Sequence, residues 1–261
     1  DDSETYEGSG FKNLQTGTDY YNESLALGIA GNFHIVAFDT ARLNTHTNGN
    51  ILANTLYAGA NFGTNNYDEV SYIANNYALV NGSSESQDKN MLVVPKGTSI
   101  SLVDNGSKFA IKGTKLDRPN ILYEDGSKSF VSLDKVKEEI TSLSSQLSSY
   151  NSSSNISKSV ESSQFVNYTL TDPDGVGVIN LDADKINNAN IDFKGFESGH
   201  SGSIIVNVNC SGRTNIEMPR EAQVYIDNVQ QSTSETTTFT AGKVVWNFYN
   251  CKGCTISAKQ M

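Results

Sequence analysis

The sequence has few basic residues, and this shortage limits the partners that the chain can take. Lysine and arginine together number 19 against 29 aspartates and glutamates, which gives a formal net charge of −10 over 261 residues. Proteins that bind nucleic acid present basic patches or stripes to the phosphates, and no such stripe is visible here. We therefore expect no nucleic-acid partner and no binding to an anionic membrane. The negative charge favours a soluble monomer.

Long apolar runs are also missing. Hydrophobic residues make up 37% of the chain, below the globular norm of roughly 45–50%, and no stretch approaches the ~20 apolar residues of a membrane span. The polar start Asp1-Asp2-Ser3-Glu4-Thr5 has neither Met nor a signal peptide, and we interpret it as the start of a mature or trimmed secreted chain. We therefore expect an extracellular location.

Histidine is scarce, and the three present, His34, His46 and His200, are dispersed. Neither the HExxH spacing of zinc proteases nor the GxSxG elbow of serine hydrolases occurs. We therefore predict no catalytic residues, no cofactor and no metal site, and a protein that is not an enzyme. A Ser-His-Asp site assembled from distant residues remains an alternative, since such triads form in space.

Short apolar runs separated by Asn, Gly and Ser turns fill most of the chain. Runs too short for a helix and bounded by turn formers are typical of β-strands. Ile51, Ile73 and Val93 stand about 20 residues apart, a spacing at the low end of solenoid repeats. We predict strands at 34–38, 51–53, 56–58, 72–74, 91–94, 99–103, 109–111, 165–170, 176–181, 191–193, 203–208, 224–226 and 243–248.

Residues 131–150 follow a helical period instead. Ser132 is a suitable N-cap, and acidic residues in the early turns favour the positive end of the helix dipole. We predict one long helix with its apolar stripe packed on strands, a polar lead-in over 1–18, a linker over 151–163, and a single domain over 19–261. Five apolar residues with alternating spacings of three and four form the stripe: Leu133, Val136, Ile140, Leu143 and Leu147.

One small acidic motif has both a functional and a structural interpretation. Asp172-Pro173-Asp174-Gly175 has a faint likeness to a calcium loop, but Asp-Pro-Asp-Gly is more often a plain turn, and no Glu stands at the twelfth position of an EF-hand pattern. Whether Asp172 and Asp174 bind calcium is left open.

The three cysteines, Cys210, Cys251 and Cys254, lack the fourth ligand of a structural zinc site, and no βαβ pattern surrounds the CxxC. The strands before Cys210 and Cys251 both end in asparagine-rich segments, and as neighbouring rungs they would bring these ends about 4.8 Å apart. A disulfide is thus favoured, between Cys210 and either Cys251 or Cys254, with one thiol left over.

Several segments, in order, resemble the choice-of-anchor A family of bacterial surface proteins. LALGIAGNFHIV (25–36) is similar to that family's leading LG-x-A-x-x-F-N-V-F strand, and TNGNILA (47–53) to its D-x-E-G-R-x-A rung, without the acidic residue and the arginine. Residues 131–147 resemble its helix, SIIVNVNCSG (203–212) its I-N-V-x-G strand, and VVWNF (244–248) its late W-N-F signature.

The resemblance implies a right-handed β-solenoid, or β-helix, with a flanking α-helix. It also implies an adhesin of the Gram-positive cell wall, whose anchor is not present in this chain. We expect a module that binds a host protein, matrix or glycan ligand of unknown identity without chemistry. A polysaccharide-acting β-helix enzyme and a structural spacer of a wall-anchored protein are the alternatives. Candidate aromatic anchors are Tyr20, Tyr21, Tyr67, Tyr72 and Tyr77, although strand tyrosines are more often core residues.

Overall fold

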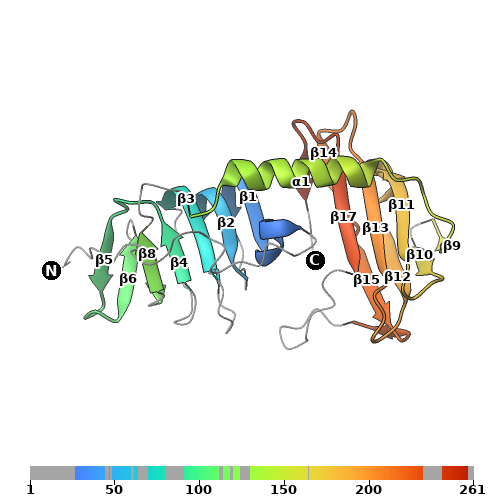
Figure 1. Cartoon of the computed structure of the whole chain (residues 1–261), viewed down its shortest axis with the longest axis horizontal. Coiled ribbons are helices and arrows are strands. Elements are labelled where there is room, and N and C mark those ends of the chain that lie inside the picture. Colours follow the sequence, from blue (N-terminus) through green and yellow to red (C-terminus); the bar gives the residue numbers. More distant parts are fainter. Residues whose placement is uncertain are drawn as a thin grey trace. The chain divides into compact units, whose positions relative to one another are not determined.

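A computed structural model describes most of the chain as β-structure with one α-helix (Figure 1). The described residues are 27–44, 47, 49–59, 62–63, 70–79, 91–111, 114–117, 120–123, 130–163, 165–231 and 243–257. They fall into two compact units, Asp1–Thr141 and Ser142–Met261. The predicted lead-in over 1–18 lies outside the described residues, and the single domain over 19–261 stays a prediction.

Unit 1 is built on a sheet of five parallel strands in the order β1-β2-β3-β4-β8. A short 3-10 helix, η2 (Gly28–Asn32), precedes the sheet, and a three-stranded antiparallel sheet, β5-β6-β7, accompanies it. The strands are β1 (Ile35–Leu43), β2 (Ile51–Ala58), β3 (Val70–Leu79), β4 (Met91–Val94), β5 (Ile100–Val103), β6 (Lys108–Ile111), β7 (Thr114–Asp117) and β8 (Asn120–Tyr123).

The parallel sheet of unit 1 is buried on both faces, which explains why its strands contain continuous apolar runs such as 51–53 and 91–94. Alternate residues such as Ile51 and Ile73 belong to one core cluster. Their neighbours Leu52 and Tyr72 are register partners and belong to a second cluster on the opposite face. This second cluster contains Val136 of α1 (Leu133–Ser148), so the helix covers that face.

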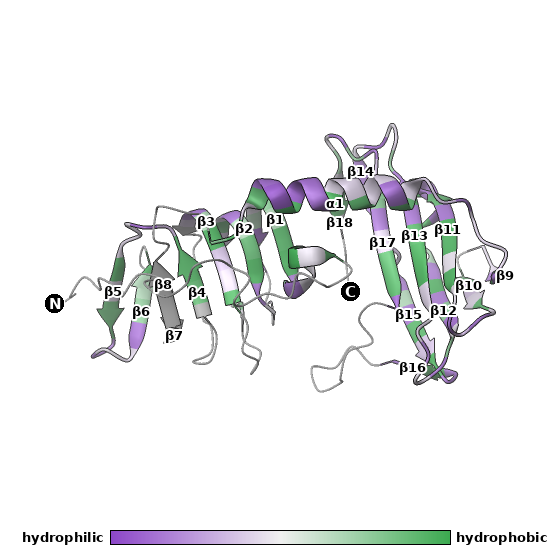
Figure 2. Ribbon diagram, viewed as in Figure 1, coloured by the Kyte–Doolittle hydropathy of each residue, from purple (hydrophilic) through white to green (hydrophobic). Residues whose placement is uncertain are grey.

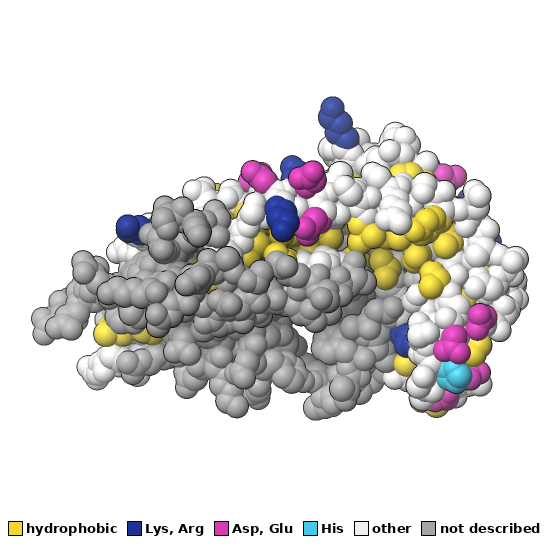
Figure 3. Space-filling model, viewed as in Figure 1, with side chains coloured by type: hydrophobic (Ala, Val, Ile, Leu, Met, Phe, Trp, Pro, Cys, Tyr) yellow, Lys and Arg dark blue, Asp and Glu magenta, His cyan; other side chains and the backbone are white. Residues whose placement is uncertain are grey.

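Helix α1 begins where the sequence predicts and is slightly shorter than the predicted 131–150. The Ser132 hydroxyl accepts a hydrogen bond from the Lys135 amide at 3.3 Å, which confirms the N-cap. Val136 is buried, and Leu133 and Ile140 pack against the same cluster. Leu143 and Leu147 are half-buried and belong to none of the core clusters, so the predicted apolar stripe is confirmed only for Leu133, Val136 and Ile140. Charged side chains occupy the outward face of this part of the helix (Figure 3).

Unit 2 contains three parallel arrangements whose strands alternate along the chain. The first is β10-β12-β15, with antiparallel edge strands β9 and β16; the second is β11-β13-β17, and the third is β14-β18. The strands are β9 (Ile156–Ser162), β10 (Phe165–Leu170), β11 (Val176–Asp182), β12 (Asn190–Phe196), β13 (Ser203–Asn209), β14 (Asn215–Glu217), β15 (Glu221–Ile226), β16 (Val229–Gln230), β17 (Val244–Tyr249) and β18 (Thr255–Ser257). A 3-10 turn, η3 (Ala183–Lys185), lies between β11 and β12.

One apolar core joins the sheets of unit 2, whose central strands are hydrophobic along much of their length (Figure 2). Tyr168 of β10 stacks on Phe193 of β12 with ring centroids 6.2 Å apart. Phe193 in turn meets Trp246 of β17 edge to face at 5.7 Å. Aromatic contacts of this kind add to the area that they bury, so these rings tie the first sheet to the second.

The outer face of β11-β13-β17 carries an asparagine ladder: Asn180, Asn207 and Asn247 are register partners. The Asn207 amide donates to Asn180 Oδ1 at 3.0 Å, and the Asn247 amide donates to Asn207 Oδ1 at 2.9 Å. Asn207 is fully buried. Buried amides in proteins are hydrogen-bonded, and the ladder provides one acceptor for the amide of Asn207 and one for the amide of Asn247.

The same three asparagines hold the C-terminal part of α1. Their amides donate to backbone carbonyls three residues apart, at 3.0 Å from Asn247 to Ser144, 2.7 Å from Asn207 to Leu147 and 2.9 Å from Asn180 to Tyr150. Three residues of α-helix rise about 4.5 Å, which nearly matches the ~4.8 Å between strands. The helix can therefore run across the strands of this sheet, as Figure 1 shows, so that every third backbone carbonyl meets the asparagine of the next strand.

Most predicted strands are confirmed, but the predicted linker over 151–163 is wrong in part. Ile156–Ser162 forms β9, an antiparallel edge strand paired with β10. Its side chains are almost all exposed, so it carries no apolar alternation that would mark it as a strand. The sequence also did not predict β7, β8, β14, β16 and β18. For β14, β16 and β18 the reason is similar, because few of their side chains enter the core.

Candidate functional site

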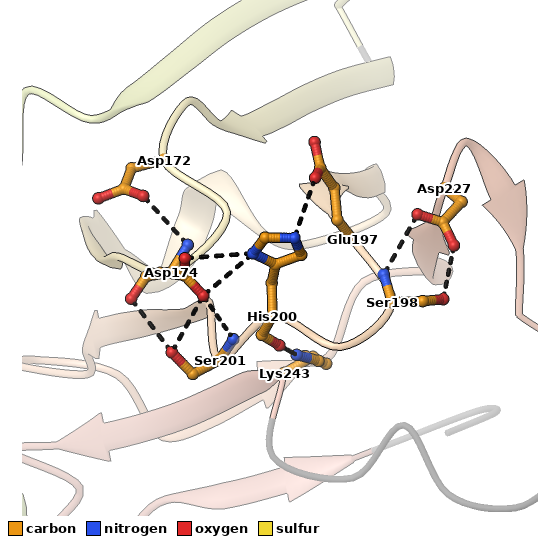
Figure 4. A network of polar contacts seen from close by, with 8 residues as sticks. All are labelled: Asp172, Asp174, Glu197, Ser198, His200, Ser201, Asp227 and Lys243. Atoms are coloured by element: carbon orange, nitrogen blue, oxygen red, sulfur yellow. Dashed lines mark hydrogen bonds and ion pairs between the residues drawn. The ribbon is translucent and has the colours of Figure 1, made fainter.

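The main polar site of unit 2 is a turn cluster at one end of its strands (Figure 4). The chain leaves β10, β12 and β15 through polar turns, and backbone hydrogen bonds stack these turns. Gly202 N donates to Pro173 O at 2.7 Å, and Asp227 N donates to Phe196 O at 2.9 Å. The members of the turn cluster are Asp172, Asp174, Glu197, Ser198, His200, Ser201, Asp227 and Lys243.

His200 lies between two carboxylates in this cluster. Its Nδ1 is 3.1 Å from Asp174 Oδ2, and its Nε2 is 3.5 Å from Glu197 Oε2. The hydrogen bond to Asp174 and the negative charge of that residue raise the pKa of His200. Figure 3 shows a histidine among acidic side chains on the surface of unit 2.

The carboxylates of the cluster accept hydrogen bonds from the chain itself. The Ser201 amide, followed by the His200 ring, lowers the pKa of Asp174. The Ser198 hydroxyl and amide lower the pKa of Asp227. The Lys243 ammonium donates to His200 O at 2.7 Å and so joins the residue before β17 to the turn before β13. These hydrogen bonds link the three turns that follow β10, β12 and β15 to one another and to Lys243.

The geometry favours the plain-turn interpretation of the Asp-Pro-Asp-Gly motif. Asp172 Oδ1 accepts from the Asp174 amide at 3.1 Å, and Asp174 Oδ1 accepts from the Ser201 amide at 3.1 Å. These oxygens are therefore bonded within the chain. No group of three or more His, Cys, Asp or Glu side chains in the described part of the chain has the geometry to hold a metal ion.

The cluster differs from a nucleophilic triad in its hydrogen bonding. Both ring nitrogens of His200 contact carboxylates, so neither is placed to take the proton of a serine. The hydroxyl of Ser198 donates instead to Asp227, and that of Ser201 is directed toward Asp174. Of the other histidines, His34 is exposed in unit 1, and His46 lies outside the described residues.

A second polar group, which the sequence did not reveal, lies on the outer face of the β10-β12-β15 sheet. Asp192 and Lys194 project from this face because Phe193 between them points into the core. The Lys194 ammonium is 3.9 Å from Asp192 Oδ2 and 5.0 Å from the ring centroid of Tyr225. Burial raises the pKa of Asp192, against the opposing effects of Lys194 and of a hydrogen bond from Tyr225.

Neighbouring amides extend this outer face. Asn167, the register partner of Asp192, is 4% exposed, and its amide donates to Glu161 at 3.0 Å. The Oδ1 of Asn167 has no hydrogen-bond partner among the described residues. Planar amide and carboxyl groups beside an aromatic ring can form directional hydrogen bonds and ring contacts with a polar ligand.

The predicted site residues have different outcomes in the structure. Tyr72 and Tyr77 are each 1% exposed and belong to the core, so their choice as ligand anchors is wrong. Tyr20, Tyr21 and Tyr67 lie outside the described residues. Cys210, Cys251 and Cys254 gather in the core cluster of unit 2 as thiols, and the disulfide among them stays a prediction.

No described helix has the length and apolar character required to cross a membrane. Comparison with protein families gives a match over residues 26–261 to the family described as "Putative Ice-binding-like adhesive domain". Among curated proteins and among solved structures, no significant match is found.

Proposed function

Because the chain belongs to the family of ice-binding-like adhesive domains, we propose that it is a bacterial cell-surface module that attaches to a ligand without transforming it. The ligand is a host protein, a matrix component or a glycan. The family match over residues 26–261 is the observation that carries this proposal. The ordered motifs of the choice-of-anchor A family support a wall-anchored, extracellular setting within it.

We further propose that the strands of unit 2 form a β-solenoid. The parallel pairs β10-β12-β15, β11-β13-β17 and β14-β18 support it, because each sheet receives a new strand each time the chain returns. The stacked turns of the turn cluster also suit a coil of this kind. Such a body offers flat side-chain faces, which suit attachment to an extended ligand.

The outer face around Tyr225 is the first binding surface to test. It combines a half-buried aromatic ring, a charged pair and planar amides on a regular backbone. Aromatic residues contribute strongly to binding interfaces. We therefore assign the ligand contact of the module to the partly exposed Lys194 and Tyr225, with the buried Asp192 beneath them as the residue that positions both.

Immobilised protein should retain a matrix protein or glycan from an array, and the ligand should be recovered chemically unchanged. Tyr225→Ala should weaken retention about ten-fold or more, as expected for an aromatic anchor. Tyr150→Ala is the matched control, because Tyr150 is an exposed tyrosine that lies just after α1, away from the β10-β12-β15 sheet. Turnover of a retained polysaccharide would instead favour an enzyme, and failure to retain any ligand would favour a spacer.

A further inference from the structure

All three cysteines of the chain meet at one end of the unit 2 core. Cys210 follows β13, Cys251 follows β17, and Cys254 precedes β18. The Cys210 amide donates to Tyr249 O at 2.9 Å, which fixes the end of β13 against the end of β17. All three cysteines belong to the same core cluster, and the thiols of Cys210 and Cys254 both act on the pKa of Cys251. Cys251 is therefore the common neighbour of the other two.

The backbone permits a bond between Cys251 and Cys254. The Cys254 amide donates to Cys251 O at 3.0 Å, so residues 251–254 form a tight turn, with Gly253 at φ +72°. The first and last Cα atoms of such a turn lie within about 7 Å of each other. Disulfides commonly join Cα atoms about 4.4–6.8 Å apart.

The three thiols differ in their access to a reagent. Cys210 is fully buried. Burial and the two neighbouring thiols raise the pKa of Cys251 to about 12, which keeps its thiol protonated. Cys251 and Cys254 are both half-buried, and the Cys254 sulfur lies 2.9 Å from the carbonyl oxygen of the exposed Arg213. This contact with an exposed residue makes Cys254 the thiol to which we assign the first reaction with an external reagent.

We propose that Cys254 and Cys251 form a thiol–disulfide exchange site that accepts small aliphatic disulfides, with Cys210 as a reserve partner for Cys251. The Cys254 thiolate attacks one sulfur of R–S–S–R, forms a mixed disulfide and releases the first RS⁻. The Cys251 thiol gives up its proton and attacks the Cys254 sulfur, which forms the Cys251–Cys254 bond and releases the second RS⁻. Two electrons pass from the protein to the reagent, and each RS⁻ takes one proton.

This exchange is independent of the adhesive function, since its residues lie in the core and in the Cys251–Cys254 turn, and the ligand face lies on β10-β12-β15. Its significance is that the module can record the redox state of its surroundings in a covalent bond. Loss of ligand retention in the Tyr225 variant would leave the exchange unchanged, so the two proposals fail separately.

The test uses the fully reduced chain treated with bis(2-hydroxyethyl) disulfide, quenched and mapped by mass spectrometry. The wild type should release two equivalents of mercaptoethanol and keep one thiol, with a Cys251–Cys254 bond and little retained adduct. Cys251→Ser should accumulate a stable adduct on Cys254, about ten-fold above the wild-type level, because the resolving thiol is gone. Cys254→Ser should react slowly and form the Cys210–Cys251 bond.

Two results would overturn the proposal. One is independent labelling of all three cysteines in the native wild type, and the other is an equal adduct level in wild type and Cys251→Ser. Circular dichroism and melting temperature establish that each variant is folded. If Cys251→Ser does not fold, the native wild type is compared with the same chain in urea, where adducts on more than one cysteine should accumulate. Equal adduct patterns in the two conditions would then refute the exchange site.

Discussion

At the scale of single residues, the backbone conformation and surroundings of position 195 restrict it to glycine. It lies in β12 at φ +90°, where the register with β15 shifts between Phe193 and Phe196. A Cβ at this position would overlap the carbonyl oxygen of Leu170 on the neighbouring strand. Only glycine permits both this conformation and this close approach.

Gly195→Ala should lower the free energy of unfolding by about 2–4 kcal/mol, because a positive φ and an overpacked contact each add a cost. Gly199→Ala is the matched control: it has φ +78°, but no atom lies within 4 Å of its added Cβ. It should cost about 1 kcal/mol. The free energy of unfolding is measured by urea denaturation. Equal losses for Gly195→Ala and Gly199→Ala would show that the close approach of Leu170 O adds no cost.

His200 makes the stability of the turn cluster depend on pH. Its pKa is raised above the ordinary value of 6.5, so its contribution is complete below pH 6.5 and is lost as the pH rises through the folded pKa. The pKa of Asp174 is lowered below 3.8, so its contribution is complete above that pH and is lost as the pH falls through its folded pKa. The contact is therefore strongest between pH 3.8 and 6.5.

Asp174→Asn should lower the pKa of His200, measured from the pH dependence of its ring proton signals by NMR. The hydrogen bond and the charge of Asp174 are the two largest causes of the raised value. Asp172→Asn serves as the control, because Asp172 bonds the Asp174 amide and not the imidazole. A His200 titration unchanged by Asp174→Asn would contradict the assigned contact.

At the scale of elements, α1 is held by two kinds of surface. Its N-terminal part packs Val136 on the apolar face of the unit 1 sheet. Its C-terminal part is bonded by Asn207 and Asn247 through backbone carbonyls. The apolar period of the sequence predicts the first kind of contact. It cannot predict the second, because an asparagine in a strand gives no sign of which carbonyl it will reach.

Asn207→Ala should destabilise the protein by about 2–4 kcal/mol, because the Leu147 carbonyl loses its donor and the Asn247 amide loses one of its two acceptors. Asn209→Ala, two residues further along β13, is the control, since Asn209 is half-buried and bonds Ser211 and Asn250. Chemical denaturation measures both variants. A loss for Asn207→Ala no larger than that for Asn209→Ala would exclude the ladder as a support of the helix.

Core strands of both units could be predicted where they carry apolar runs, as at residues 51–53 and 203–208, whereas β7 and β8 of unit 1 were not predicted. The edge strand β9 could not, because its polar side chains are exposed and only its backbone pairs with β10. The cysteine cluster was anticipated from the strands that precede it, but the turn cluster was missed. Its members stand far apart in the sequence, and only stacking of the turns brings Asp174 to His200.

At the scale of the whole molecule, the parallel pairings join segments that are distant along the chain. In unit 2, β11 pairs with β13, and β13 pairs with β17, with other strands between them in sequence. Each pairing needs closure of a long loop before its contacts form. Folding of such a topology is slow compared with that of helical proteins.

Refolding from urea, followed by tryptophan fluorescence in stopped flow, should therefore take milliseconds to seconds or longer. The single tryptophan, Trp246, lies in β17 against Phe193 and Phe248, so its signal reports formation of the unit 2 core. Complete recovery of the native signal within microseconds would indicate that the core forms from local contacts and would contradict the pairing.

The asparagine ladder also limits the number of strands that one straight helix can cover. Helix steps of about 4.5 Å and strand steps of about 4.8 Å are nearly commensurate, and the difference of about 0.3 Å accumulates with each rung. Over the three strands of this sheet the accumulated difference stays below about 1 Å. Over many more strands, a straight helix would move out of register with the amides, so a wider sheet would need a bent or interrupted helix. The length over which a straight helix can be bonded in this way therefore limits the number of strands that the sheet beneath it can have.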